Sequence, residues 1–230
     1  VSSFGPPAPH KVAAKLKARN RHVLWFADFR DLWVDNHIAS ARGPFRWIEY
    51  WEESRTVGRY ADGLLTVSAP LADNLRRRHV RPVWVIPNGF DPEEYPDWVQ
   101  RFNQSKEKTS GKVILVYTGT IYPGMRDPTP LFEAIQQLIS EGVVTSSSIE
   151  VQFYGANSDT LEGMIEQAGA SEWVKWMGLV DRKQCLDAQA KADALLLLEW
   201  GNPGAAGVLT GKVFEYLVSG RPVLGVGITR

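Results

Sequence analysis

The feature that most constrains this 230-residue chain is a repeated alternation of short apolar runs with helical patterns. Eight runs resemble strands, at residues 22–27, 64–67, 83–86, 113–117, 149–154, 174–177, 194–198 and 222–226. Helical patterns separate them, at about residues 43–57, 69–78, 128–141, 159–168, 182–191 and 211–219. Strands alternating with helices predict doubly wound parallel sheets, so the expected fold class is α/β.

A polar segment at residues 91–111 interrupts this alternation and indicates a connection between two units. We therefore expect one unit at residues 1–91, a linker at residues 92–111 and a second unit at residues 112–230. The first unit supplies three predicted strands, too few for a finished sheet and core. The last predicted strand has no covering helix after it. We expect a piece of a longer protein that lacks sequence at both ends.

Composition argues against several function classes. With 26 basic and 26 acidic side chains, the net charge is zero, which disfavours nucleic-acid binding. Cys185 is the single cysteine, so no internal disulfide can form, and this suits a reducing compartment. No apolar run approaches the ~20 residues that span a bilayer, and no signal peptide is visible. We expect a cytoplasmic protein.

Tryptophans in polar contexts are compatible with a peripheral contact between the protein and the inner face of a membrane. Five of the nine tryptophans stand in such contexts: Trp25, Trp33, Trp47, Trp51 and Trp98. Each of them singly is more often a core or half-buried packing residue.

A glycine-rich loop followed by a helix, at residues 201–219, is the strongest candidate ligand site. Loop glycines expose backbone N–H groups at a helix N-terminus, and these groups favour an anion. Lys212 stands in the first helical turn, where the helix dipole disfavours a cation. This placement favours a compensating anionic ligand of the diphosphate type.

The 3.6-residue period divides this helix into two sides. We expect Lys212, Glu215, Tyr216 and Ser219 on a polar side and Leu217 on an apolar side. The alternative to a ligand site is a solvated face on which Lys212 and Glu215 form a surface ion pair of small effect.

Eight short motifs follow one another along nearly the whole chain, at residues 2–10, 25–33, 61–68, 85–91, 117–121, 153–155, 178–180 and 211–223. Their order resembles the GT-B glycosyltransferases of family 4, especially those that build bacterial surface polysaccharides. The resemblance implies two Rossmann-like domains that face each other across a cleft. The C-terminal domain would hold the nucleotide sugar, and the N-terminal domain, incomplete here, would hold the acceptor.

The resemblance also implies roles for the glycine-rich loop and its helix. Glu215 matches the second glutamate of the family's E-x7-E motif, which binds the ribose hydroxyls, and a carboxylate can accept two adjacent O–H donors. The first glutamate would fall where this chain has Gly207, so we expect backbone N–H groups of residues 204–211 to replace it. Thr210, Gly211 and Lys212 would lie against the diphosphate.

Further donor-site residues follow from the strand ends of the second unit. Many relatives place an arginine after the glycine of the first loop; here Thr120 follows Gly119, and Arg126 is the candidate cation. A surface arginine beside Asp127 is the alternative. Three residues at strand ends would lie near the base, since ligands bind at that edge of such sheets. They are Gly155, Leu179 and Val180.

On the acceptor side, Asp28, Arg30 and Asp31 end a predicted strand and are the candidate catalytic residues. They could bind acceptor hydroxyls or stabilise the donor phosphate, and a buried ion-pair network is the alternative. Many family members have a histidine about where Arg30 stands, which leaves its role open. His10 could reach the cleft, although a lone histidine is more often structural.

These observations predict transfer of a sugar from a nucleoside-diphosphate sugar to a hydroxyl of a glycan or lipid-linked acceptor, in polysaccharide or glycoconjugate synthesis. The donor loops lack an Asp-x-Asp motif, so we expect no metal and no cofactor, with Lys212, Arg126 and helix N-termini stabilising the departing diphosphate. The resemblance implies retention of anomeric configuration. The alternatives are a nucleotide-sugar-binding fragment without turnover and a GT-B-fold sugar-nucleotide epimerase.

Overall fold

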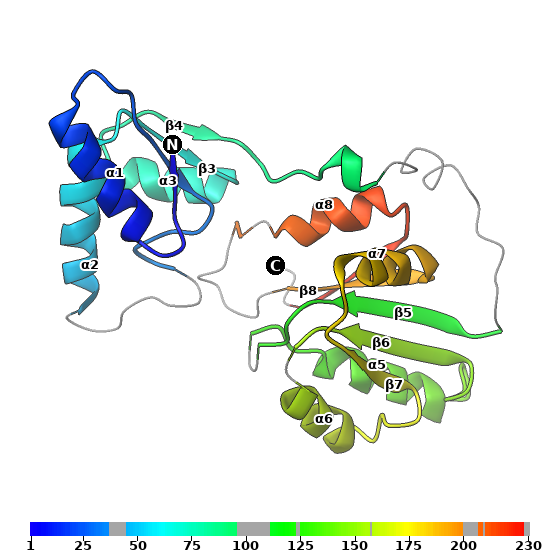
Figure 1. The fold of residues 1–230 in the computed structure, drawn as a ribbon. Helices are drawn as coiled ribbons and strands as arrows, with labels where there is room; N and C mark the ends of the chain where they lie inside the picture. Colours follow the sequence, from blue (N-terminus) through cyan, green and yellow to red (C-terminus); the bar gives the residue numbers. More distant parts are fainter. Residues whose placement is uncertain are drawn as a thin grey trace. The chain divides into compact units, whose positions relative to one another are not determined.

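The computed structural model describes residues 1–36, 45–95, 111–122, 125–156, 158–199, 207–208 and 210–227. The chain divides into two compact units, Val1–Asn88 with Asn202–Thr210, and Gly89–Gly201 with Gly211–Arg230. Each unit contains one parallel β-sheet with helices packed against it (Figure 1). The predicted α/β class with two parallel sheets is confirmed.

The second unit has a five-stranded parallel sheet in the order β7-β6-β5-β8-β9. Its strands are β5 (Val113–Thr118), β6 (Ile149–Tyr154), β7 (Val174–Gly178), β8 (Ala194–Leu198) and β9 (Val223–Val226). The strand order reverses between β5 and β8. In open α/β sheets, the carboxyl ends of the strands at such a reversal form a crevice where ligands bind.

Helices cover both faces of this sheet (Figure 1). α5 (Thr129–Ser140) and α6 (Ser158–Gln167) pack on one face, and α7 (Arg182–Lys191) and α8 (Gly211–Val218) pack on the other. Successive side chains of β5 alternate between the two cores: Leu115 and Tyr117 face α5 and α6, whereas Val116 faces α7 and α8.

The predicted polar side of α8 is wrong in part. Tyr216 and Ser219 are buried, while Leu217 is 58% exposed. The Tyr216 hydroxyl lies 3.2 Å from the backbone N–H of Thr118, which donates to it. Because β5 satisfies the hydroxyl, the tyrosine ring can pack into the core, and the helix presents Leu217 outward instead.

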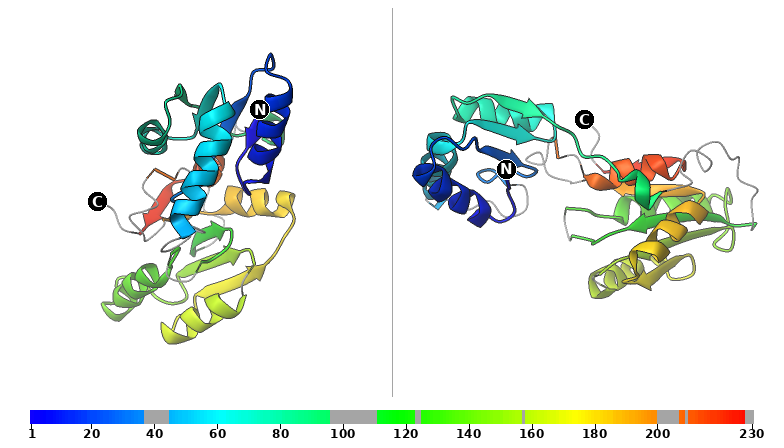
Figure 2. Two further views of the ribbon diagram at one scale, coloured as in Figure 1. Left: turned by 90° about the vertical axis from the view of Figure 1, so that its left-hand side faces the viewer. Right: turned by 45° about the horizontal axis from the view of Figure 1, so that its top comes forward.

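The first unit has a four-stranded parallel sheet in the order β1-β2-β3-β4. Its strands are β1 (Ser2–Ser3), β2 (Phe26–Phe29), β3 (Gly63–Thr66) and β4 (Val83–Val85). Its helices are α1 (Ala8–Arg19), α2 (Phe45–Glu53), the π-helix η1 (Ser54–Gly58) and α3 (Ala69–Arg78). In the described residues, α1 and α2 lie side by side (Figure 2), and Lys11 forms an ion pair with Glu52 at 2.8 Å.

The three-strand prediction for the first unit is wrong, because β1 and α1 were not expected. β1 has two residues, which is too short for a periodic pattern. α1 begins within a run of prolines that indicates a loop, although proline is tolerated in a first helical turn. β2 also starts later than predicted, at Phe26, and Val23 and Leu24 before it are exposed.

The connection between the units is described only at its ends. Residues 89–95 belong to the second unit and include the 3₁₀ helix η2 (Pro92–Glu94). Residues 96–110, most of the predicted linker, lie outside the described residues. The predicted boundaries at residues 91 and 112 stay a prediction.

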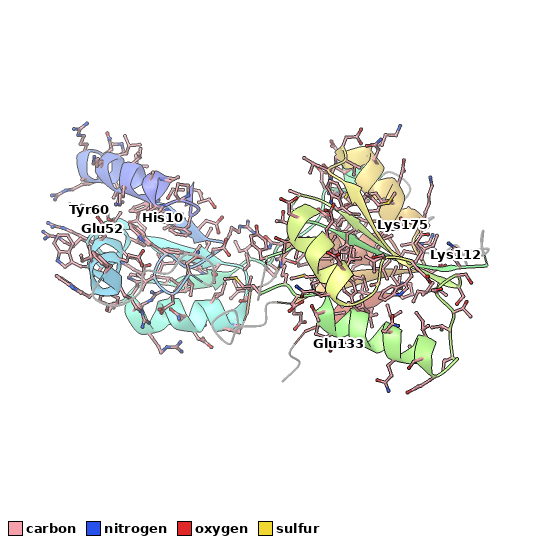
Figure 3. The ribbon with its side chains drawn as sticks, turned by 90° about the horizontal axis from the view of Figure 1, so that it is seen from below. His10, Glu52, Tyr60, Lys112, Glu133 and Lys175 are labelled. Carbon is pink, nitrogen blue, oxygen red and sulfur yellow. The ribbon has the colours of Figure 1, made fainter. Side chains whose placement is uncertain are left out.

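The amino ends of the second sheet carry charges that are already paired. The Glu150 carboxylate of β6 lies 2.8 Å from Lys175 and 3.4 Å from Lys112, both labelled in Figure 3. The Lys175 hydrogen bond is the main cause that holds the pKa of Glu150 below its usual value.

Candidate functional site

Three glycines close the loops at the carboxyl ends of β5, β6 and β7. The Gly119 N–H donates to Tyr154 O at 2.7 Å, and the Gly155 N–H donates to Gly178 O at 2.9 Å. Gly119, Gly155 and Gly178 have φ of +140°, +153° and +81°, which L side chains rarely adopt. A Cβ on Gly155 would lie 2.3 Å from the Gly119 carbonyl oxygen. The strand-end loops therefore lie against one another.

Lys212, in the first turn of α8, lies over this edge of the sheet. Its Nζ donates to the Tyr117 hydroxyl at 3.0 Å and lies 4.2 Å from the centroid of the same ring. The hydroxyl donates in turn to Thr120 O at 3.1 Å. A Cβ on Gly119 would lie 2.0 Å from Nζ, so any other residue at position 119 would require Lys212 to shift.

The electrostatics of this edge favour an anion. Burial, and then the charge of Arg126, lowers the pKa of Lys212 to about 7, although Glu215 opposes this. Burial raises the pKa of Tyr117, and Arg126 opposes that shift through its charge and a hydrogen bond. Lys212 and Arg126 thus converge on Tyr117, and no described carboxylate forms an ion pair with Lys212. An anion placed here would relieve the repulsion between the two cations.

The local sequence also explains how Arg126 is held. The Arg126 N–H donates to Tyr122 O at 3.0 Å, and the guanidinium carbon lies 5.8 Å from the Tyr122 ring centroid. Asp127 accepts a hydrogen bond at 2.9 Å from the backbone N–H of Thr129, the first residue of α5. The carboxylate beside Arg126 therefore caps a helix.

Glu215 lies one turn beyond Lys212 but pairs with a different cation. Its Oε1 is 3.0 Å from Nη1 of Arg182, the first residue of α7. The predicted alternative, a Lys212–Glu215 surface pair, is not among the ion pairs of the described residues. Sequence reasoning missed Arg182, although the Asp181 capping box places it at a helix N-terminus, where a cation is disfavoured.

The other predicted donor residues are distributed as follows. Leu179, which is 81% exposed, and Val180 directly follow Gly178 at the end of β7. Gly211 is the first residue of α8. Gly207 belongs to the first unit, where an added Cβ would lie 2.6 Å from Cβ of Pro70. Most of the predicted 204–211 loop lies outside the described residues, so the roles of its backbone stay predictions.

Thr210 is also in the first unit, just before α8 begins. Its hydroxyl is buried without a hydrogen-bond partner among the described residues. Its predicted position against a diphosphate stays a prediction.

The acceptor-side candidates form one cluster in the first unit. The Nε of Arg30 lies 3.0 Å from Oδ2 of Asp28, and its Nη1 donates to Oδ1 of Asn88 at 2.6 Å. The Ser3 hydroxyl also donates to Asp28, at 3.3 Å. Asp31 follows two residues after β2. The structure brings Asp28 and Arg30 together at the end of β2 and adds Asn88, and their catalytic roles stay predictions.

His10 does not reach a surface of the first unit. His10, labelled in Figure 3, is fully buried. Its ring centroid is 4.9 Å from that of Phe29, and its Nδ1 lies 2.7 Å from the Ser2 hydroxyl. The indole N–H of Trp25 donates to the same hydroxyl at 2.8 Å. Burial lowers the pKa of His10 to about 4, partly opposed by Glu53 and Asp28. His10 is a packing residue.

The described part of the chain has neither a metal cluster nor a membrane-spanning helix. No group of three or more His, Cys, Asp or Glu side chains there could hold a metal ion. No helix there is both long and apolar enough to cross a membrane. The expected metal independence and the expected peripheral membrane contact stay predictions.

Solved structures resemble this chain, whereas no protein-family model and no curated protein matches it significantly. A variant of S. aureus TarM is 12% identical, with a TM-score of 0.59 over 88% of this chain and 36% of TarM. WaaG is 16% identical, with a TM-score of 0.60 over 98% of this chain and 66% of WaaG. The trehalose-6-phosphate synthase OtsA is 14% identical, with a TM-score of 0.62 over 98% of this chain and 56% of OtsA.

WaaG is described as a glycosyltransferase. The chain has the GT-B fold. It spans about a third to two thirds of the length of these structures, between 36% and 66%. The expected resemblance to GT-B glycosyltransferases is confirmed at the level of fold, and the assignment to family 4 stays a prediction.

Proposed function

We propose that this chain is the donor-binding part of a glycosyltransferase that transfers a sugar from a nucleoside-diphosphate sugar to an acceptor hydroxyl. The observation that carries the proposal is the convergence of Lys212 and Arg126 on Tyr117, at the carboxyl edge of β5. Lys212 and Arg126 lie close together, and no described carboxylate forms an ion pair with Lys212. A diphosphate could bind both cations at once.

The solved neighbours support this ligand class. The TarM variant was crystallised with UDP and α-GlcNAc-glycerol, and WaaG is described as a glycosyltransferase involved in lipopolysaccharide biosynthesis. A Burkholderia vietnamiensis neighbour is described as a UDP-forming trehalose-phosphate synthase, with a TM-score of 0.61 at 12% identity. We extend from them a role in polysaccharide or glycoconjugate synthesis, with a glycan or lipid-linked acceptor.

The proposed chemistry assigns separate tasks to the donor residues. Negative charge accumulates on the diphosphate as the bond from the sugar to the leaving oxygen breaks. Lys212, Arg126 and the N-terminus of α8 stabilise that charge, which allows a metal-independent reaction. Glu215 accepts the ribose hydroxyls. Retention of anomeric configuration is part of this proposal.

Asp28, Arg30 and Asp31 are proposed to bind the acceptor. A carboxylate paired with a guanidinium presents both an acceptor and donors for hydrogen bonds, which suits the hydroxyl groups of a sugar. Asn88 adds a side-chain amide held by Arg30 at 2.6 Å.

Thermal unfolding and product detection with UDP-, GDP- and ADP-sugars test this proposal. A donor that binds the native state raises the unfolding midpoint, and catalysis releases the nucleoside diphosphate with sugar transfer or donor hydrolysis. The Lys212→Ala and Glu215→Ala variants should remain folded and lose the shift. If no donor shifts the wild-type midpoint, the donor site is absent; a shift without turnover would favour a binding fragment.

A further inference from the structure

Arg182 joins three segments of the second unit. Its Nη1 lies 3.0 Å from Oε1 of Glu215 in α8. Its Nη2 donates to Oε2 of Glu94 at 2.7 Å and to the Tyr95 hydroxyl at 3.2 Å. The two ends of one planar guanidinium group therefore hold the candidate ribose carboxylate on one side and the segment 89–95 on the other. Among the ion pairs of the described residues, Arg182 is the partner that Glu215 has.

The position of Arg182 is unfavourable unless these contacts form. It is the first residue of α7, where the positive end of the helix dipole repels a cation. Asp181 caps this helix end by accepting from the Gln184 N–H at 2.8 Å, so the helix needs no further side chain there. Glu215 is the main cause that raises the pKa of Arg182, followed after desolvation by Glu94.

The segment that contains Glu94 is itself firmly placed on the second unit. Asp91 caps η2 by accepting from the Glu93 N–H at 2.9 Å. Tyr95 is 4% exposed, and its ring lies 6.1 Å from that of Phe90 at an interplanar angle of 89°. Arg182 therefore receives its second contact from a segment with internal contacts of its own, and two hydrogen bonds to that segment restrain the guanidinium in the orientation that meets Glu215.

We propose that Arg182 is a positioning residue for the ribose of the donor nucleotide, and that Glu94 with Tyr95 orients Arg182 for this task. The inference rests on the proposed function, because it takes Glu215 as the ribose ligand. Arg182 holds the carboxylate of Glu215 through Oε1, and the carboxylate keeps acceptor capacity for hydroxyl donors, since an ionised carboxylate has about four acceptor sites. A guanidinium fork restrains carboxylate orientation better than a lysine ammonium does.

The proposal predicts a selective effect on ribose recognition. An interaction with a ribose hydroxyl is present in a nucleoside diphosphate and absent in its 2′,3′-dideoxy form. The ratio of the two dissociation constants therefore reports the contacts of the ribose hydroxyls, and Glu215→Ala assigns them to Glu215. A residue that only stabilises the fold would weaken both ligands equally and leave this ratio unchanged.

The experiment is calorimetric titration of the 230-residue chain with UDP, GDP and ADP, followed by the 2′,3′-dideoxy form of the nucleotide that binds best. We expect a wild-type ratio of about tenfold, the size of one hydrogen bond to a charged group. Glu215→Ala should bring the ratio close to one. Arg182→Gln should reduce it to about threefold, and Arg182→Lys should fall between Arg182→Gln and wild type.

Two further variants complete the design. Glu94→Gln removes the charge that orients Arg182 and should lower the ratio less than Arg182→Gln does. Lys183→Gln makes the same charge change one residue along α7 and should leave the ratio at its wild-type value. Unfolding midpoints without ligand identify any variant that is not folded; if Arg182→Gln is unfolded, Arg182→Lys and Glu94→Gln carry the comparison.

The outcomes separate this inference from the proposed function. A wild-type ratio that Glu215→Ala abolishes and Arg182→Gln leaves unchanged overturns the role of Arg182 and leaves the donor site standing. Equal weakening of both ligands by Arg182→Gln also overturns it. If the wild type binds none of the three nucleotides, the donor site itself fails and the role of Arg182 fails with it. If Glu215→Ala leaves the ratio unchanged, Glu215 is not the ribose ligand, and the role of Arg182 fails while the diphosphate site stands.

Discussion

The charged side chains at the two ends of the second unit's sheet differ in how they are paired. At the amino end, the Glu150 carboxylate is held between Lys112 and Lys175, within 3.4 Å of both ammonium groups. At the carboxyl end, Lys212 and Arg126 meet over Tyr117, and Lys212 has a phenol and an aromatic ring as its described contacts.

This difference indicates which end binds a ligand. Paired surface charges contribute little to stability and need nothing further. Burial and a neighbouring cation destabilise the charged form of an ammonium group. A bound anion removes that penalty. The ion pair of Lys175 with Glu150, which Lys212 lacks among the described residues, therefore favours the carboxyl end as the ligand-binding end, although Glu215 there is paired with Arg182.

The largest expected effect is on nucleotide affinity. Lys212→Ala removes a charge-assisted contact to the diphosphate and should weaken UDP, GDP or ADP binding about 100-fold, measured by calorimetry. Lys175→Ala makes the same substitution at the amino end and should change affinity less than about twofold. Equal losses in the two variants would erase the distinction between the ends of the sheet.

His10 is a second buried base, and it lies outside the candidate donor site. Its lowered pKa should therefore appear as a pH dependence of the free energy of unfolding. Its pKa falls from 6.5 to about 4 on burial, so the unfolded chain binds the extra proton between these values. Stability should be fully present above pH 6.5 and fall by about 2 kcal/mol by pH 5.

Chemical denaturation of wild type and His10→Phe across this pH range measures that loss. The variant should have a flatter pH profile between pH 6.5 and 5, whatever its absolute stability. An unchanged slope in His10→Phe would assign the pH dependence to other groups.

A Gly119→Ala substitution tests whether the carboxyl end of the second sheet depends on the close approach of Lys212 to Gly119. An alanine would place its Cβ 2.0 Å from Nζ and would have to adopt a φ of +140°. We expect destabilisation of about 1–3 kcal/mol by denaturant titration, together with weakened nucleotide binding. Gly163→Ala, at a helical glycine where a Cβ meets nothing within 4 Å, is the control and should be neutral or slightly stabilising. Similar behaviour of the two alanine variants would contradict the packing of Lys212 on Gly119.

The smallest effect is expected at the amino end. Lys175→Ala removes an ion pair whose lysine is 51% exposed and should lower stability by less than about 1 kcal/mol near neutral pH. Because Lys175 lowers the pKa of Glu150, this contribution should disappear as pH falls and the carboxylate gains a proton. Denaturation at pH 7 and at pH 3 measures the difference. A loss that persists at pH 3 would have to come from packing of the lysine stem.

The sequence predicted the second unit better than the first for a physical reason. Buried parallel strands are continuous apolar runs, and the predicted ranges 149–154 and 194–198 coincide with β6 and β8. β1 has two residues and α1 begins among prolines, so neither gives a periodic signal. Tyr216 was placed on the wrong side of α8 because its hydroxyl depends on Thr118, a partner distant in sequence.

The candidate site was predictable only where local sequence carries the signal. Lys212 was identified because a cation at a helix N-terminus is unfavourable, and the same argument applied to Arg182 but was not made. The contact of Lys212 with Tyr117 joins residues 95 positions apart, which no local pattern shows. Likewise, the attachment of Glu94 to Arg182 depends on how residues 89–95 pack on the second unit.

Proton uptake on nucleotide binding tests the central claim most directly. With a pKa of about 7, Lys212 is mostly uncharged at pH 8 in the free protein, whereas the nucleotide phosphates, whose second pKa is near 6, have already lost their protons. Calorimetry at pH 8 in buffers of different ionisation enthalpy should show uptake of close to one proton per bound nucleotide, and Lys212→Ala should abolish it. Binding without proton uptake in the wild type, or the same uptake in the variant, would contradict a neutral Lys212 that a bound diphosphate protonates.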